Sequence, residues 1–235
     1  VGGRPPRVRG RARRPSELLT DQSDSALIAP MFPLGTALLP GEPLPLRIFE
    51  PRYRTMLGDC LAAGDPARFG VVLIARGSEV GGGDVRHDVG TFAEIDSVDR
   101  LPDGRATLVA FGARRFRVLE WLSDDPYPRA RVEVLPDFVF DAGQRARLSM
   151  LGMRIRDLVG DFARARGVDP TQLQDVFRGN DADTEPVATL YRWVASLPTG
   201  PLDRQRLLEA RDVDAGLDIL ADAADGFEAR MAFGS

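Results

Sequence analysis

The chain has 235 residues, of which 43% are apolar and 28% are charged. This is the composition of an ordinary globular protein, and it excludes collagen-like, coiled-coil and fully disordered chains. A single Cys excludes an internal disulfide, and one Cys with one His excludes the usual zinc sites built from nitrogen and sulfur ligands. The longest aliphatic run, Val71–Ala75, is far shorter than the roughly 20 residues of a membrane-spanning helix. Because no signal-peptide pattern follows the N-terminus, we expect a cytoplasmic protein without a membrane partner.

The sequence contains no lysine, so all 31 basic residues are Arg. A Walker A loop needs a Lys on the nucleotide phosphates, and Ser-Lys proteolysis needs a Lys as its base. Schiff-base chemistry needs an amine, and a guanidinium cannot replace it because it stays protonated. We therefore expect no enzyme of these classes, and no sequence motif indicates a cofactor or a metal.

Charge is uneven along the chain. Residues 1–30 carry six Arg and three acidic residues, a net charge of +3, which leaves −7 for the rest of a chain whose total is −4. We interpret 1–30 as a disordered Arg/Pro/Gly-rich extension, with a nucleic-acid-binding arm as the alternative. A stricter version of the disordered-extension interpretation is that translation starts at Met31, where the folded pattern begins. Since an acidic body attracts phosphates poorly, we expect nucleic-acid binding only weakly, through 1–30.

The first half of the folded pattern is rich in β segments. Prolines keep residues 32–34 and 44–49 extended, and a helix with one apolar face follows from Glu50-Pro51. Cys60 lies on that apolar face, which favours an inert core thiol. Further strands are predicted over residues 69–75, 91–100, 106–112, 116–122 and 129–135, with a loop over 76–88 and a hairpin turn over 101–105. Strands without a βαβ rhythm favour an antiparallel barrel or sandwich.

After Asp137 the apolar spacing becomes helical. Asp141 and Gln144 have the spacing of a capping box, and a strong apolar stripe follows over 148–162. Further helices are predicted from residues 184, 202 and 213 onwards. The chain is thus predicted as a mostly β half followed by an all-α half.

No motif in the chain has the pattern of a catalytic site. The glycine run 81–83 lacks the strand-GxGxxG-helix context of a nucleotide loop and is more typical of a tight turn. His87 lies in a polar segment without a Ser or Cys motif and is a weak candidate for a general base. The basic cluster 114–117 could bind a phosphate or a carboxylate. However, side chains alternate between the two faces of a strand, and this more often places such charges in solvent.

Several strings stand out together by their content and spacing. They are Phe32-Pro33-Leu34, Leu38-Leu39-Pro40-Gly41, Leu46-Arg47-Ile48-Phe49-Glu50-Pro51-Arg52-Tyr53, Phe69-Gly70-Val71-Val72-Leu73-Ile74, Gly81-Gly82-Gly83, Val89-Gly90-Thr91, Leu101-Pro102-Asp103-Gly104-Arg105 and Gly112-Ala113-Arg114-Arg115-Phe116-Arg117-Val118. Over residues 31–225 they resemble the N-terminal, substrate-binding domain of the Lon protease family.

The resemblance implies an α+β fold: an N-terminal PUA-like antiparallel β pseudo-barrel with one inserted helix, followed by a C-terminal helical bundle. The domains that it implies are an extension over 1–30, the β domain over 31–137, the helical bundle over 138–229 and a flexible tail over 230–235.

The resemblance also implies a function. In the full protease this domain contacts polypeptide substrates and supports assembly, while the chemistry belongs to ATPase and Ser-Lys protease modules. This chain resembles stand-alone, actinobacterial-type members that lack those modules, so a peptidase label would be inherited from the family. We expect a non-catalytic module that binds unfolded or partly folded polypeptides, as an adaptor in proteolysis or quality control beside a separate ATPase or protease.

The expected binding site is a groove between barrel and bundle, with apolar walls and a rim of Arg or Glu. The candidate peptide-binding residues are Glu50, Arg52, Tyr53, Glu79, Gly81, Gly82, Gly83, Arg114 and Arg115. For Glu50 and Arg52, an ion pair that joins the helix to the barrel is the alternative. Two other functions stay open: an RNA-binding module, by analogy with other PUA-like barrels, and a small-molecule enzyme at the barrel mouth that uses a carboxylate or His87 with a displaced pKa.

Overall fold

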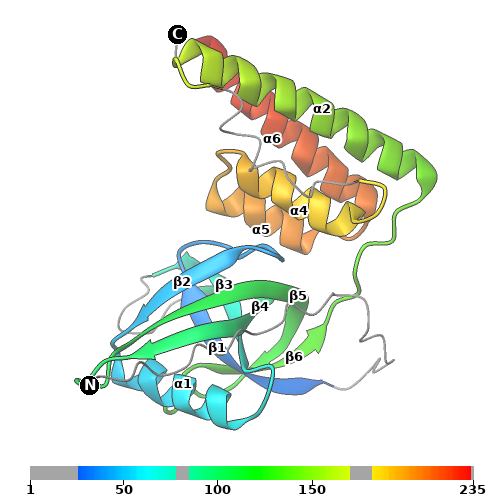
Figure 1. The fold of residues 1–235 in the computed structure, drawn as a ribbon. Helices are drawn as coiled ribbons and strands as arrows, with labels where there is room; N and C mark the ends of the chain where they lie inside the picture. The colour runs from blue at the N-terminus through cyan, green and yellow to red at the C-terminus, as the bar shows by residue number, and fades with distance from the viewer. Residues whose placement is uncertain (1–25, 78–84, 170–181, 234–235) are drawn as a thin grey trace, which may run out of the picture.

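The computed structural model describes residues 26–77, 85–169 and 182–233. A β-rich half with one helix comes first, and a bundle of helices packs at one end of it (Figure 1). The elements in chain order are β1 (Leu27–Leu34), β2 (Pro43–Ile48), α1 (Pro51–Ala62), β3 (Arg68–Arg76), β4 (Val85–Arg100), β5 (Ala106–Trp121), β6 (Arg129–Val134), α2 (Ala142–Ala165), α4 (Pro186–Ser196), α5 (Pro201–Glu209) and α6 (Val213–Phe233).

The strands form one sheet that closes on itself. The strand order is β2-β5-β4-β3-β1-β6, and β6 pairs again with β5, which completes a ring. Residues 106–111 of β5 pair with β2 and residues 116–121 pair with β6, so the two short strands share one edge of β5. The prediction of a β pseudo-barrel with one inserted helix, followed by a helical bundle, is confirmed.

The sheet differs from the antiparallel arrangement that the sequence favours at one pair of strands. β1 and β3 run parallel, with Met31 opposite Gly70. A parallel pair needs a crossover connection, and here β2 and α1 supply it between the two strands. The inserted helix therefore has a topological role that its sequence does not reveal.

Three strand boundaries also differ from expectation. Residues 85–88, predicted as loop, begin β4, and the two strands predicted over 106–112 and 116–122 are the single strand β5. The β4–β5 register shifts between Thr91 and Ala93, so β5 accommodates Gly112-Ala113-Arg114 by an irregular register rather than by a break. β1 begins at Leu27, ahead of the expected boundary at Met31, because its first residues pair with β6.

Local signals in the sequence account for two helix starts. α1 has Pro51 in its first turn, and it buries Tyr53, Met56 and Cys60 on the predicted face. At the start of α2, Asp141 Oδ1 accepts a hydrogen bond from the Gln144 amide at 2.8 Å, and Gln144 Oε1 accepts one from the Asp141 amide at 3.0 Å. The predicted capping box is therefore confirmed.

The interior of the barrel is filled by two tilted aromatic rings, those of Phe92 and Phe116, whose centroids lie 4.7 Å apart. Gly90 gives the Phe116 ring its space: a Cβ at this position would lie 2.1 Å from the Val71 carbonyl oxygen and 2.8 Å from the ring. A second core cluster packs α1 on the barrel, and a third extends from the bundle onto the barrel.

Candidate functional site

The junction between barrel and bundle, where the sequence predicts a groove, is held by α5. Arg204 Nε donates to the Ala37 carbonyl at 3.0 Å, and the Arg204 guanidinium forms an ion pair with Glu42. Gln205 Nε2 donates to the Val89 carbonyl at 3.0 Å. Polar contacts thus join the two halves directly over this part of the junction.

A hollow of about 500 Å³ lies beside these contacts. Its walls include Leu135, Phe138 and Val139, and Val139 is 87% exposed. Arg117 and Glu209 are among its charged lining residues. It has the apolar walls and charged rim that the sequence analysis expects of a peptide groove, and Arg115 is the expected site residue that lines it.

Arg115 is buried, whereas strand alternation favours a solvated position for it. The side chain is 5% exposed, and its guanidinium lies 4.1 Å from the centroid of the Phe138 ring. It donates to the carbonyls of Leu208, Ala210 and Pro136 at 2.9, 3.2 and 3.1 Å. The bundle covers the outer face of β5 here, and Arg115 supplies donors to the otherwise unpaired carbonyls at the end of α5.

The Glu50-Arg52-Tyr53 corner is held by contacts within itself and with the barrel. Arg52 Nε lies 3.1 Å from Glu50 Oε2, and the Arg52 guanidinium lies 4.5 Å from the centre of the Tyr53 ring. Tyr53 is 3% exposed and stacks on Phe32 at 4.1 Å between centroids. The ion pair considered from the sequence is present, and a peptide-binding role for the three residues stays a prediction.

The remaining candidates are scattered or not described. Arg114 is exposed, and its Nη2 lies 3.5 Å from the Leu135 carbonyl. His87 Nδ1 lies 3.2 Å from Glu209 Oε1, so the single His contacts the bundle rather than a nucleophile. Glu79, Gly81, Gly82 and Gly83 lie outside the described residues.

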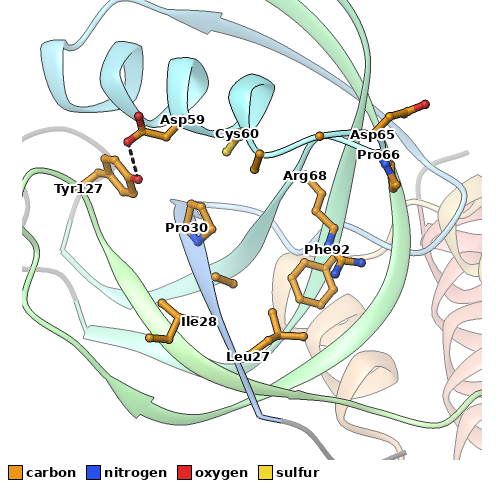
Figure 2. Close-up of a pocket in the computed structure, with 13 residues that line it drawn as sticks. Leu27, Ile28, Pro30, Asp59, Cys60, Asp65, Pro66, Arg68, Phe92 and Tyr127 are labelled. Atoms are coloured by element: carbon orange, nitrogen blue, oxygen red, sulfur yellow. Dashed lines mark hydrogen bonds between the residues drawn. The ribbon is translucent and has the colours of Figure 1, made fainter. Parts of the chain in front are cut away.

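A larger hollow, of about 670 Å³, opens on the barrel between β1 and the C-terminal end of α1 (Figure 2). It is a wedge between β1 and β3: the two strands pair from Met31 and Gly70 onwards, while residues 27–30, among the strands that the structure describes, pair only with β6. The lining residues are Leu27, Ile28, Ala29, Pro30, Asp59, Cys60, Ala63, Gly64, Asp65, Pro66, Arg68, Phe92 and Tyr127.

Backbone chemistry explains why β1 and β3 separate at this point. The Met31 amide donates to the Pro128 carbonyl at 2.8 Å, on the β6 side, so the nitrogen of the preceding residue faces β3. That residue is Pro30, which has no N–H to donate. Among the described residues, the β3-facing edge of 27–30 pairs with no strand, and by the same alternation it presents the backbone of Ile28 to the wedge.

The walls of the wedge are largely apolar. Phe92, 2% exposed and the cross-strand partner of Gly70, lies among its buried lining residues, and Ile28 at its mouth is 61% exposed. The Arg68 guanidinium lies 4.9 Å from the centre of the Phe92 ring. Figure 2 shows Arg68 reaching over this ring, and Arg68 forms no ion pair within the part of the chain that the structure describes.

Burial and neighbouring groups keep Tyr127 and Cys60 of the wedge in their protonated forms. Tyr127 Oη donates to Asp59 Oδ2 at 2.8 Å, and burial together with this bond raises the pKa of Tyr127 to about 12. Burial and the neighbouring Asp59 charge raise the pKa of the Cys60 thiol to about 12. Cys60 is therefore a thiol rather than a thiolate at neutral pH, as expected of a core cysteine.

This wedge is not predicted by the sequence. Composition places residues 27–30 in the extension, although Leu27-Ile28-Ala29-Pro30 is an apolar run continuous with the first predicted strand, and that run is the available signal. Arg68 and Tyr127 carry no motif. They lie far apart in the sequence, and only the closure of the barrel brings both to the wedge.

No group of three or more His, Cys, Asp or Glu residues that could hold a metal ion exists within residues 26–77, 85–169 and 182–233. In the same ranges, no helix combines the length and the apolar character needed to cross a membrane.

Comparison with known proteins gives the family. The family model described as the ATP-dependent protease La (LON) substrate-binding domain matches residues 28–223. The chain belongs to the Lon substrate-binding domain family. The match starts within β1, and so includes the strand that borders the wedge.

Individual relatives agree with this family. Lon protease 2 from Sorangium cellulosum is 29% identical over 202 residues, which cover 83% of this chain and 24% of that protease. Lon protease 2 from Herpetosiphon aurantiacus is 28% identical over 207 residues and is covered to the same extent, 24%. The chain thus spans about a quarter of the length of these Lon proteases, and it matches their substrate-binding domain rather than their ATPase or protease modules.

Two solved structures have the same fold. The Lon N-terminal domain protein from Xanthomonas campestris aligns with a TM-score of 0.60 and 26% identity, covering 83% of this chain and 98% of that one. The N-terminal domain of Lon protease from the Mycobacterium avium complex aligns with a TM-score of 0.58 and 22% identity, covering 85% and 98%.

Proposed function

We propose that this Lon-type domain is a non-catalytic module that holds an extended segment of another polypeptide in the wedge beside β1. The carrying observation is the combination of an apolar hollow with a strand edge, over residues 27–30, that pairs with no strand of the described ranges. An extended segment can donate and accept hydrogen bonds along such an edge, while its side chains bury apolar surface against the walls. A volume of about 670 Å³ is within the range of ligand pockets.

The family supports the same conclusion. The match is to a domain described as substrate-binding, and the substrates of a protease are polypeptides. By this reasoning the module serves as an adaptor in proteolysis or quality control, presenting unfolded or partly folded chains to a separate ATPase or protease.

The absence of bond-breaking chemistry is supported by the side chains. The sequence has no lysine for a Walker A loop or a Ser-Lys dyad. Cys60 and Tyr127 in the wedge are held in their protonated forms by raised pKa values, so neither is an activated nucleophile at neutral pH.

The test is a titration of a fluorescently labelled, reduced and carboxymethylated unfolded protein with this chain, followed by anisotropy. We expect saturable binding, and Ile28→Asp at the mouth of the wedge should weaken it about tenfold or more, equivalent to about 1.4 kcal/mol. The matched control is Leu119→Asp, which places the same charge on another exposed position of the barrel (50% exposed) and should leave the affinity unchanged.

Two further arms make the result decisive. Val139→Asp places the charge in the junction hollow, and a loss of binding with this variant alone would move the site to the groove predicted from the sequence. No saturable binding of the unfolded protein at tens of micromolar would overturn the function. RNA that binds in a low-salt mobility shift, and still binds after deletion of residues 1–25, would favour the RNA-binding alternative.

A further inference from the structure

We propose that the wedge captures the C-terminal end of a polypeptide, with the Arg68 guanidinium holding the terminal carboxylate. This inference rests on the proposed function and specifies which part of the bound chain the wedge selects. It is carried by the direction of the strands, by the position of Arg68 at the start of β3 and by the charges around the wedge.

The strand geometry limits how far a bound segment can run. β1 and β3 are parallel with Met31 opposite Gly70, so Arg68, two residues before Gly70, is level with Ala29. A segment that pairs with the first part of this edge, Leu27 and Ile28, therefore follows the line of β3 on the N-terminal side of Arg68. β3 itself occupies that line from Arg68 onwards, since Arg68 pairs with Glu94 of β4. A bound segment must end or turn away at Arg68.

The charge at this point decides the direction of the bound chain. A segment parallel to β1 brings its C-terminus to the Arg68 guanidinium, whereas an antiparallel segment brings its N-terminus there. A carboxylate is attracted by a guanidinium and matches its fork of donors, while an ammonium group is repelled. The guanidinium also lies 4.9 Å from the centre of the Phe92 ring, which favours a fixed plane for it.

The carboxylates of the wedge do not neutralise Arg68. Asp59 accepts the hydrogen bond of Tyr127, at 2.8 Å, and Figure 2 shows Asp65 turned away from the guanidinium. Neither residue forms an ion pair with Arg68, and no other carboxylate in the described ranges does so. A cation on an apolar ring, with no carboxylate partner in the described part of the chain, is a suitable receptor for a carboxylate ligand.

The walls of the wedge determine which side chains the bound polypeptide should carry next to its terminal carboxylate. Leu27, Ile28 and Phe92 lie along the path of the segment, and the buried ring of Tyr127 closes it near α1. Apolar residues at the end of the ligand would bury their surface here at about 25 cal/mol per Å². The expected ligand class is thus an extended polypeptide end with apolar last residues and a free carboxylate.

The experiment uses a fluorescein-labelled decapeptide ending in Ala-Val-Leu, prepared with a free C-terminal carboxylate and, separately, as the C-terminal amide. We expect the full chain to bind the acid at least tenfold more tightly than the amide. Arg68→Gln should lower the affinity for the acid to that for the amide, and should leave the affinity for the amide nearly unchanged. Arg47→Gln, which removes an equal charge from an exposed position on strand β2, is the control and should keep the difference.

The outcomes separate this inference from the proposed function. Equal binding of acid and amide by the unchanged chain overturns C-terminal capture and leaves polypeptide binding intact, provided that the unfolded protein still binds. An amidated peptide with Asp in its last position that binds as tightly as the free acid also overturns it, because the terminus is then not what is recognised. If neither the peptides nor the unfolded protein binds, the proposed function fails as well.

Discussion

Arg115 brings together three segments that are distant in the sequence: strand β5, the chain after β6 and the end of α5. Its guanidinium donates to the carbonyls of Leu208, Ala210 and Pro136 and covers the ring of Phe138. Hydrogen bonds from a charged donor contribute more than neutral ones, and carbonyls that lose their donor inside a protein are costly. We therefore predict that Arg115→Gln lowers the free energy of unfolding by about 3 kcal/mol, measured by urea denaturation.

The neighbouring residue offers the control for this prediction. Arg114→Gln makes the same substitution one position earlier, on an exposed side chain with a single long contact of 3.5 Å to the Leu135 carbonyl. Its effect should stay within about 0.5 kcal/mol. Similar losses for both variants would show that Arg115 does not join the two halves in the way described.

At the scale of elements, the first turn of α2 is stabilised by its capping box. The capping box pairs the side chain and backbone of Asp141 with those of Gln144, which satisfies two amides that the helix cannot satisfy itself. Asp141→Ala should cost about 1 kcal/mol of unfolding free energy. Asp157→Ala removes an equal charge from an exposed interior position of the same helix and should change stability by less than half as much. Circular dichroism during urea denaturation measures both, and an equal effect of the two would contradict the capping role.

At the scale of the whole molecule, barrel and bundle are expected to unfold together. One core cluster includes Leu39, Leu73 and Val89 of the barrel half along with the bundle, and separating the halves would expose these side chains. The chain has two tryptophans, Trp121 at the end of β5 and Trp193 in α4. In Trp193→Phe, tryptophan fluorescence therefore reports the barrel alone, while circular dichroism at the helical minimum is dominated by the bundle.

The expected result is one midpoint for both signals in that variant, even though the loss of the buried Trp193 ring shifts the midpoint itself. Comparing two probes within one protein removes the effect of the substitution on stability. A fluorescence midpoint clearly separated from the helical midpoint would show that the two halves are independent units.

The sequence by itself determined the features that depend on neighbouring residues. The Asp141–Gln144 capping box, the turn over 101–105 and the apolar faces of the helices follow from interactions within a few positions, so spacing alone predicts them. The family resemblance belongs to the same category, since it rests on short strings in a particular order. The absence of lysine also needed no structure to limit the chemistry.

Only the tertiary structure decided what depends on contacts between distant segments. Burial of Arg115 follows from the bundle that covers the outer face of β5, and periodicity within one strand carries no information about such a cover. The wedge exists because β1 and β3 run parallel but pair from Met31 and Gly70 onwards, and the closure of the barrel brings both Arg68 and Tyr127 to the walls of the space that this leaves. The closure of the whole barrel determines which strands pair with one another. The location of the candidate site therefore could not be predicted from the sequence around any one of its residues.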